Sequence, residues 1–361
     1  MRLHQKIGLS HRGFTLIEIL VSLLVFGVLG ATLYSAYVTQ VQNTSREHSY
    51  ARAAMEMEII RTILERDISM AGYGLAQDFS ATGTPGPAYV APARSLAGTN
   101  NGSDPSMISG MPADKSDTLT LMGTALGLRS RTAQGWTASI AENQPPLTWS
   151  DSREQLQDGD RHIVLEPFAK ALIVNGAKVP FVFSSSTATN QPKGSLFYGL
   201  YGVASAVDDG STMPYYAVRY YLGGASANDP AHCAPGTVSL LRAESRKKPA
   251  PNGGDPILSC VLNMQVAFGL DSNEDDAMDL WDEGGGTAAG LTAKDFRKQI
   301  KQVRLYILAQ TSRSALGGSS PTPILVGDAD LGTGAEVALD TDQESYQWKL
   351  TTIHITPRNI R

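Results

Sequence analysis

The sequence predicts an α+β fold in which one long N-terminal helix packs on an antiparallel β-sheet head. Three observations carry this prediction: an apolar run at residues 14–38, a helical pattern over residues 39–74, and a series of strand-like segments with long polar loops in residues 75–361. The chain has 361 residues, of which 42% are hydrophobic, so it can bury a substantial core. We therefore expect one anchor helix and one or two globular units.

The apolar run at residues 14–38 is long enough to cross a membrane. At about 1.5 Å per helical residue it is roughly 37 Å long, against about 30 Å for a hydrocarbon core. Three basic residues precede the run: Arg2, Lys6 and Arg12. The positive-inside rule therefore predicts that residues 1–13 lie in the cytoplasm and the head lies outside. An ordinary secretory signal has a shorter apolar region and an Ala-x-Ala cleavage site behind it, which this run lacks. A simple single-pass anchor is the alternative.

Residues 12–18 read RGFTLIE. With the basic leader before it and the apolar run behind it, this stretch resembles the processing site of type IV prepilins and type II secretion pseudopilins. The resemblance implies that a prepilin peptidase cuts after Gly13, which makes residues 1–13 a leader peptide, and then methylates the new N-terminus at Phe14. It also implies that Glu18 neutralises the N-terminal amine of a neighbouring subunit during assembly. A carboxylate inside a membrane costs about 2.5–3.5 kcal/mol, so a partner is expected, and snorkelling to the lipid headgroups is the alternative.

The helical pattern continues beyond the apolar run, through residues 39–74. Apolar residues recur there at helical steps: Tyr50, Ala54, Met57, Leu64 and Ile68. A glycine at Gly72 or Gly74 can end the helix in the left-handed conformation. We expect one helix of about 55 residues, with one half in lipid and an amphipathic half packed on the head. Residues 66–74 resemble the helix end of PilW-like minor pilins.

The head, residues 75–361, carries several segments rich in β-branched and aromatic residues. The predicted strands are 118–122, 162–165, 179–183, 215–222, 238–242, 261–268, 302–308 and 348–355. The order of the later segments resembles PilW and the secretion pseudopilin J, and the resemblance implies a sheet against the outer half of the helix. Long polar loops are expected at 76–116, 129–160, 184–213, 243–256, 270–298 and 311–345.

The charge and cysteine content limit the partners of the chain. The net charge is −5, and it becomes −8 when the three basic residues of the leader are removed, which disfavours nucleic acid as a direct partner. Cys233 and Cys260 are too few for a disulfide scaffold and wrongly spaced for a zinc site. In an oxidising compartment they can form one disulfide, which would stabilise the head by roughly 3–4 kcal/mol. Two free thiols are the alternative.

One acidic stretch begins like a calcium-binding loop. The candidate oxygen ligands are Asp271, Asn273, Asp275, Asp279 and Asp282. The sixth position, where such a loop needs glycine for its sharp turn, is Asp276. A solvated acidic hairpin tip is therefore the favoured alternative to a calcium site.

The sequence contains no catalytic motif, and we expect no enzyme and no cofactor apart from the possible calcium. It lacks a Gly-x-Ser-x-Gly motif, a His-Glu-x-x-His motif and a P-loop, and its six histidines are scattered along the chain.

The resemblance implies a PilW-like minor pilin of a type IV pilus that primes assembly at the start or tip of the filament. The implied partners are the prepilin peptidase, other minor pilins, the major pilin, the inner-membrane assembly platform and a tip adhesin. The implied location is the inner membrane, with the head in the periplasm, and then the pilus at the cell surface. Two alternatives remain: a type II secretion pseudopilin of the J type, and a membrane-tethered periplasmic enzyme or binding protein.

Overall fold

The computed structural model of the protein describes residues 15–75, 78–82, 96–99, 116–126, 136–142, 144–150, 155–168, 171–173, 181–182, 193–200, 216–223, 232–245, 254–283, 291, 293–313 and 319–359. The leader, Gly13 and Phe14 lie outside these residues. The chain divides into two compact units, residues 1–52 and residues 53–361, and each is described by itself.

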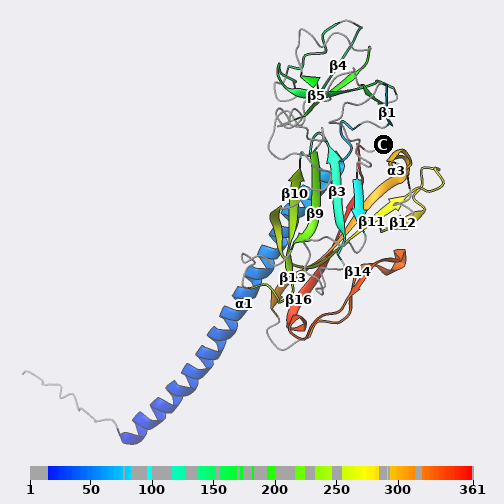
Figure 1. The fold of residues 1–361 in the computed structure, drawn as a ribbon. Helices are drawn as coiled ribbons and strands as arrows, with labels where there is room; N and C mark the ends of the chain where they lie inside the picture. Colours follow the sequence, from blue (N-terminus) through cyan, green and yellow to red (C-terminus); the bar gives the residue numbers. More distant parts are fainter. Residues whose placement is uncertain are drawn as a thin grey trace, which may run out of the picture. The chain divides into compact units, whose positions relative to one another are not determined.

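Helix α1 (Leu16–Met70) has 55 residues and confirms the predicted long helix (Figure 1). It ends in a turn that contains Gly72 and Gly74, both with positive φ, as the sequence predicts. At Gly74 a side chain is excluded, because a Cβ would lie 2.5 Å from the hydroxyl of Thr124. The helix therefore stops where the chain must pass close to Thr124, which directly follows the strand Thr118–Gly123.

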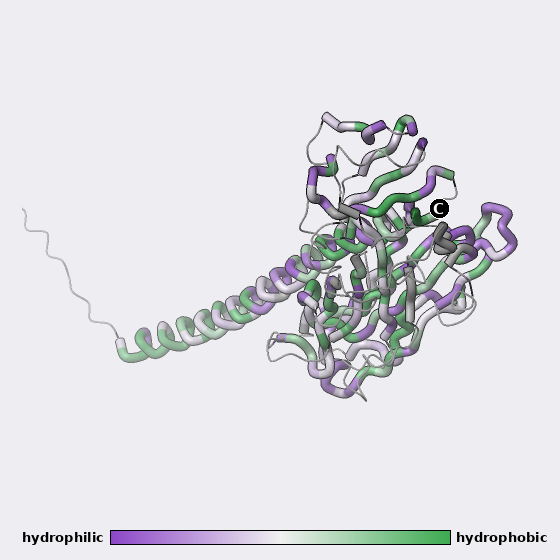
Figure 2. Tube along the Cα trace, turned by 45° about the horizontal axis from the view of Figure 1, so that its top comes forward, coloured by the Kyte–Doolittle hydropathy of each residue, from purple (hydrophilic) through white to green (hydrophobic). Residues whose placement is uncertain are grey.

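The first unit contains the apolar part of α1. Figure 2 shows this part as a hydrophobic stretch, with hydrophilic residues appearing further along the helix. Among the described residues, α1 is the one helix long and apolar enough to cross a membrane by length and composition. Its large side chains are exposed in the chain by itself, for example Leu16 at 78% and Phe26 at 73%.

The second unit is built on a large antiparallel sheet. Its strands follow the order β16 (Tyr346–Ile355), β13 (Ile300–Arg313), β11 (Asp255–Leu270), β10 (Val238–Ser245), β9 (Tyr216–Gly223), β3 (Thr118–Gly123) and β2 (Leu96–Thr99), and β12 (Leu280–Asp282) pairs with β11. Every pairing in this sheet is antiparallel, which confirms the predicted fold class.

The main core lies between the second part of α1 and the large sheet. Three helix residues, Ile60, Leu64 and Ile68, are completely buried in it, as is Ala71 in the turn that follows the helix. The sheet supplies Leu119, Leu121, Val218, Tyr220, Leu240, Met264, Val266, Leu305 and Ile353, among others. The predicted stripe is therefore right for Leu64 and Ile68 but wrong for Tyr50 and Ala54, which are exposed. Helical periodicity shows which residues share a face, but not where the sheet begins to cover that face.

The opposite face of the large sheet is covered by a hairpin of β14 (Ile324–Asp328) and β15 (Thr333–Val337), joined by the short helix η3 (Ala329–Leu331). Val326 and Val337 of this hairpin are buried with Tyr306 and Leu308 of β13. The expectation of a long polar loop at 311–345 is therefore wrong in part, because this stretch contains the hairpin with its two buried valines and also the short helix η4 (Gln343–Ser345).

A smaller sheet lies in the region where mainly loops were predicted. It comprises β1 (Asp78–Thr82), β6 (Ala171–Ile173), β5 (Arg161–Leu165), β8 (Leu196–Leu200) and β4 (Trp136–Ala138) in that order, with β7 (Phe181–Val182) paired to β5. Leu156, Val164 and Phe197 form its small core. We refer to it as the small sheet.

The loop predictions at 76–116, 129–160, 184–213 and 270–298 are also wrong in part. These stretches contain β1, β2, β4, β8, β12 and the helix α3 (Ala293–Gln299). Each of these strands has five residues or fewer, so neither a period of two nor a run of β-branched residues can stand out from the turn residues around it.

Candidate functional site

Glu18 closes a capping box at the start of α1. Its Oε2 accepts hydrogen bonds from the backbone N–H and from the hydroxyl of Thr15, both at 3.1 Å, and its own N–H donates to the Thr15 hydroxyl at 3.4 Å. The negative charge also lies at the positive end of the helix dipole. This local role of Glu18 was not predicted, although the Thr-x-x-Glu spacing that produces it is visible in the sequence.

The surroundings of Glu18 are apolar and exposed in the chain by itself. Its neighbours Ile17, Ile19 and Leu20 are 69%, 51% and 57% exposed. An apolar helix surface of this size requires lipid or another protein around it. In the described part of the chain, Thr15 is the residue whose groups bind the Glu18 carboxylate, and both bonds go to Oε2.

A second acid on the same helix, Asp67, has the opposite environment. It is completely buried, and its Oδ2 accepts a hydrogen bond from the hydroxyl of Tyr220 at 2.6 Å. Arg242 donates to the same oxygen through Nε at 2.8 Å and forms an ion pair with it through Nη2 at 2.7 Å. Arg242 also donates to the carbonyl of Leu126 and pairs with Glu244. This network ties the end of α1 to β9 and β10.

Burial governs the electrostatics of this network. It raises the pKa of Asp67, and this effect outweighs the opposing influence of Arg242 and Tyr220. One reason is that Oδ1 of Asp67 is buried without a hydrogen-bond partner in the described structure. Burial, together with the neighbouring Asp67, also raises the pKa of Tyr220 well above its ordinary value, so its hydroxyl stays a donor.

Cys233 and Cys260 form a disulfide, with Cα atoms 5.0 Å apart, and the described residues contain no free cysteine. The bond joins the segment before β10 to β11. Gln310 holds the same segment, because it accepts from the N–H of Ala234 at 2.6 Å and donates to the carbonyl of His232 at 3.0 Å. The side chain of His232 is exposed beside the sulfurs.

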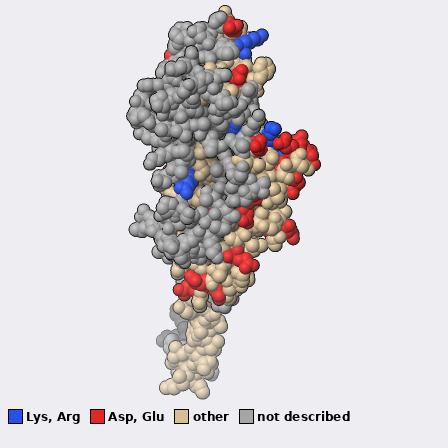
Figure 3. Space-filling view, turned by 45° about the vertical axis from the view of Figure 1, so that its right-hand side comes forward, with Lys and Arg blue, Asp and Glu red and all other residues tan. Residues whose placement is uncertain are grey.

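The predicted calcium ligands lie in an acidic turn between β11 and β12, and Figure 3 shows acidic side chains gathered on this side of the molecule. Asp271 accepts from the N–H groups of Asp275 and Asp276, at 3.0 and 2.9 Å. Asp279 binds the N–H of Ser272 at 2.8 Å. Asp282 lies on β12.

A lysine occupies the position of a counter-ion in this turn. The ammonium of Lys301 lies 2.9 Å from Asp271 and 2.9 Å from Asp276. Burial acts to raise the pKa of Asp271, but the hydrogen bonds from Lys301 and the backbone outweigh it and lower that pKa. These contacts favour the acidic hairpin tip over the calcium alternative, which stays a prediction.

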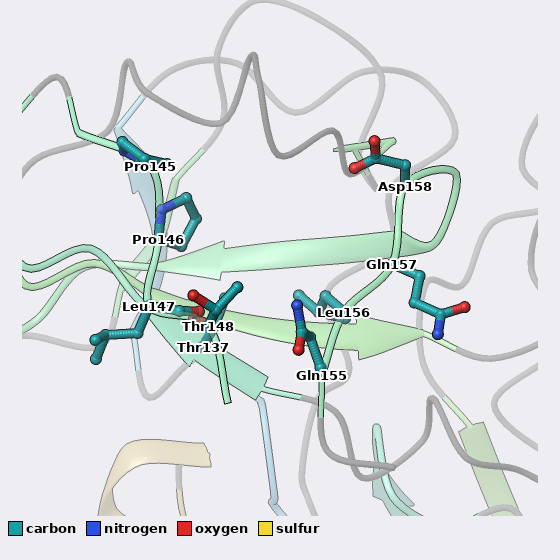
Figure 4. Close-up of a pocket in the computed structure, with 9 residues that line it drawn as sticks. All are labelled: Thr137, Pro145, Pro146, Leu147, Thr148, Gln155, Leu156, Gln157 and Asp158. Carbon is teal, nitrogen blue, oxygen red and sulfur yellow. Dashed lines mark hydrogen bonds between the residues drawn. The ribbon is translucent and has the colours of Figure 1, made fainter. Parts of the chain in front are cut away.

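A pocket of about 590 Å³ lies beside β4 of the small sheet. Figure 4 shows it between two segments, one with Pro145 to Thr148 and one with Gln155 to Asp158. Thr137 is nearly buried at its base, and its hydroxyl donates to the carbonyl of Leu147. The pocket is lined by both apolar and polar residues. The hydroxyl of Thr137 is already bound within the chain, so it is not left to bind a ligand.

Comparisons with known proteins place two matches on the chain. A family described as Type IV Pilus-assembly protein W matches residues 219–359, and the Prokaryotic N-terminal methylation motif matches residues 9–34. A solved structure of a type IV-like pilin from Thermus thermophilus is similar with a TM-score of 0.36 and 11% identity, covering 86% of this chain and 97% of that one. No curated protein matches the chain. The first family match begins within β9, extends through β16 and leaves out the small sheet.

Proposed function

We propose that this chain is a PilW-like minor pilin that primes filament assembly at the start or tip of a type IV pilus, and the PilW family match and the N-terminal methylation-motif match support this proposal. Pilin-family membership implies a structural pilus component that contacts other pilus components, and not an enzyme. The proposal adds the position in the filament and the specific partners: other minor pilins, the major pilin, the inner-membrane assembly platform and a tip adhesin.

The proposal includes processing of the N-terminus. The methylation-motif match over residues 9–34 supports cleavage by a prepilin peptidase between Gly13 and Phe14 and methylation of Phe14. It also supports an initial location in the inner membrane, with residues 1–13 in the cytoplasm and the head in the periplasm. The subunit then leaves the membrane for the pilus.

The observation that carries the proposal is the exposed apolar part of α1 with Glu18 at its start. Helix packing can replace lipid contact at little hydrophobic cost, so this surface suits both a membrane and a bundle of pilin helices. An acid in such a surface is stabilised when a charged partner meets it. We propose that the partner is the N-terminal amine of a neighbouring subunit, which peptidase cleavage exposes.

Two substitutions separate the charge of Glu18 from its capping role. Glu18→Gln removes the charge but keeps a residue that can complete a capping box, whereas Thr15→Val removes the cap and keeps the charge. We expect Glu18→Gln to lower the number of surface pili, because the amine loses its counter-charge, and Thr15→Val to leave it close to wild type. Mass spectrometry of the mature chain should show methyl-phenylalanine at position 14 in both variants.

Three results would contradict the proposal: undiminished piliation in Glu18→Gln, an N-terminus other than Phe14, or a loss of type II secretion with normal pili when the chain is absent. The last result would favour the pseudopilin alternative, which shares the N-terminal motif.

A further inference from the structure

Large apolar side chains are exposed at one end of the small sheet. Outside α1, the exposed large hydrophobic residues of the described chain are Ile140 (57%), Leu147 (37%), Phe168 (94%) and Met278 (40%). The first three belong to the small sheet or its turns, and we call them the apolar end.

The strand register places Ile140 and Phe168 at the same end of the sheet. Leu196, at the start of β8, is opposite Ala138 at the end of β4 and also opposite Leu165 at the end of β5. Ile140 follows the first of these strand ends, and Phe168 follows the second. An exposed apolar side chain therefore follows each of these two strands at the end of the sheet where β8 begins.

Hydrogen bonds hold these segments together. Ser139 donates its N–H to the carbonyl of Ser195 at 3.0 Å, and the N–H of Gly194 donates to the carbonyl of Ser139 at 2.7 Å. A Cβ on Gly194 would lie 3.0 Å from the side chain of Pro167, so the turn after β5 packs directly against this segment. Leu147 joins them, because its N–H donates to the carbonyl of Ala138 at 3.0 Å.

Packing among the described residues does not account for Phe168, which is 94% exposed. The turn that carries it is closed by the backbone, because the N–H of Glu166 donates to the carbonyl of Ala171 at 2.8 Å. The core of the small sheet uses other residues, including Val164 and Phe197. Single exposed apolar residues are common, but three at one sheet end form the kind of patch that marks a contact with another molecule.

The charges beside the apolar end favour a protein over a lipid surface. Glu142 and Glu166 lie next to the apolar end in the chain. Lys193 lies in the segment before β8, the strand that pairs with both β4 and β5. Anionic lipid headgroups would be repelled by the two carboxylates. An apolar centre with a polar, charged rim is the usual composition of a protein interface.

We infer that the apolar end binds the head of another pilus subunit, one that presents apolar side chains and a basic residue opposite Glu142 and Glu166. This inference rests on the proposed function, because it takes the partner from the same filament. The small sheet lies outside the region that the PilW family match covers, so this contact belongs to a part of the head that the match does not describe.

Site-specific crosslinking in piliated cells tests the contact. Phe168 is replaced in the full chain by the photo-crosslinking amino acid benzoyl-phenylalanine, and the matched control carries the same replacement at Met278, which is exposed in the acidic turn. We expect irradiation to join position 168, but not position 278, to a second pilin-type subunit identified by its peptides. No crosslink, a crosslink only to lipid or to another copy of this chain, or equal crosslinking from position 278 would overturn the inference.

A second pair of variants measures the contribution of the phenylalanine itself. With the crosslinker at Ile140, Phe168→Ser should lower the yield of the same crosslink by about tenfold, and Met278→Ser should leave it unchanged, because a buried aromatic residue dominates an interface. An intact Cys233–Cys260 disulfide shows that the large sheet of each variant folds. Suppose that the mature chain begins at Phe14 and that Glu18→Gln lowers the number of pili, but that this crosslink is absent. This result would refute the inference about the apolar end and leave the proposed function standing.

Discussion

Two carboxylates on one helix differ in where their partners are found. Glu18 lies in an exposed apolar stretch of α1 and binds Thr15, its neighbour in the same turn. Asp67, near the other end, is completely buried and binds Tyr220 and Arg242 of two different strands. The partners of Asp67 therefore come from the tertiary structure, whereas the partner of Glu18 comes from a local cap.

The difference shows how one helix can serve two tasks. Around Asp67 the helix is part of the head, and the buried network joins it firmly to the sheet. Around Glu18 the helix has no such internal network in the described chain, so its apolar surface is available to lipid or to other subunits. A single substitution at each position should accordingly disturb either folding or assembly.

The largest effect on folding is expected from Arg242→Met. It leaves the buried carboxylate of Asp67 without its counter-charge, which should lower the free energy of unfolding by about 3–5 kcal/mol. Chemical unfolding of the full chain in detergent measures this change. The double variant with Asp67→Leu should recover most of the loss, because it removes the buried charge as well.

Arg61→Met is the matched control, since Arg61 pairs with Glu65 on the exposed side of the same helix. It should not change the unfolding curve. The contrast between the two acids would be lost if Arg242→Met were as harmless as this control.

Removing the disulfide should have the next largest effect. Replacing Cys233 by Ser and Cys260 by Ala should cost roughly 3–4 kcal/mol of unfolding free energy, because the unfolded chain regains the freedom of the closed loop. Surface piliation by the stable fraction should be kept, since neither residue lies on α1. Two reactive thiols in unreduced protein, or an unchanged unfolding curve, would show that the bond does not stabilise the head.

The pH dependence of stability should reveal Asp67 directly. Burial raises its pKa above the ordinary value of 3.8, so the folded state binds the proton more tightly than the unfolded chain does. Its contribution to stability is then fully present below pH 3.8 and is lost as the pH rises through the folded pKa. We expect the wild type to lose stability relative to Asp67→Asn as the pH is raised from about 3 to about 7. A difference independent of pH would mean that burial does not shift this group.

The smallest effect is expected for calcium at the acidic turn. Asp271 already has an internal partner, Lys301, and in this respect it resembles Asp67 more than Glu18. Because the ammonium of Lys301 lies beside Asp271, where a calcium ion would bind, calorimetry of the full chain at millimolar calcium should give no binding heat. Heat that fits one site, and that is lost in Asp271→Asn, would establish the calcium alternative instead.

Several strands could be predicted because their residues alternate over a long enough stretch. The prediction at 215–222 closely matches β9, and the one at 348–355 lies within β16. The strand β8 could not be predicted, because Gly199 interrupts a segment of five residues, and the strands paired on its two sides have only three and five residues. The hairpin of β14 and β15 was missed for a related reason, since Gly327 and Gly334 weaken its pattern while Val326 and Val337 are buried only by contact with the sheet.

The sequence by itself determined the long helix, its apolar start, the motif around Gly13 and Glu18, and the antiparallel class of the head, because each depends on residues close together in the chain. The tertiary structure decided the partners of Asp67, the extent of the buried helix face and the apolar end of the small sheet. These features join residues far apart in sequence, such as Asp67 and Arg242, whose proximity arises only when the strands have paired and covered the helix.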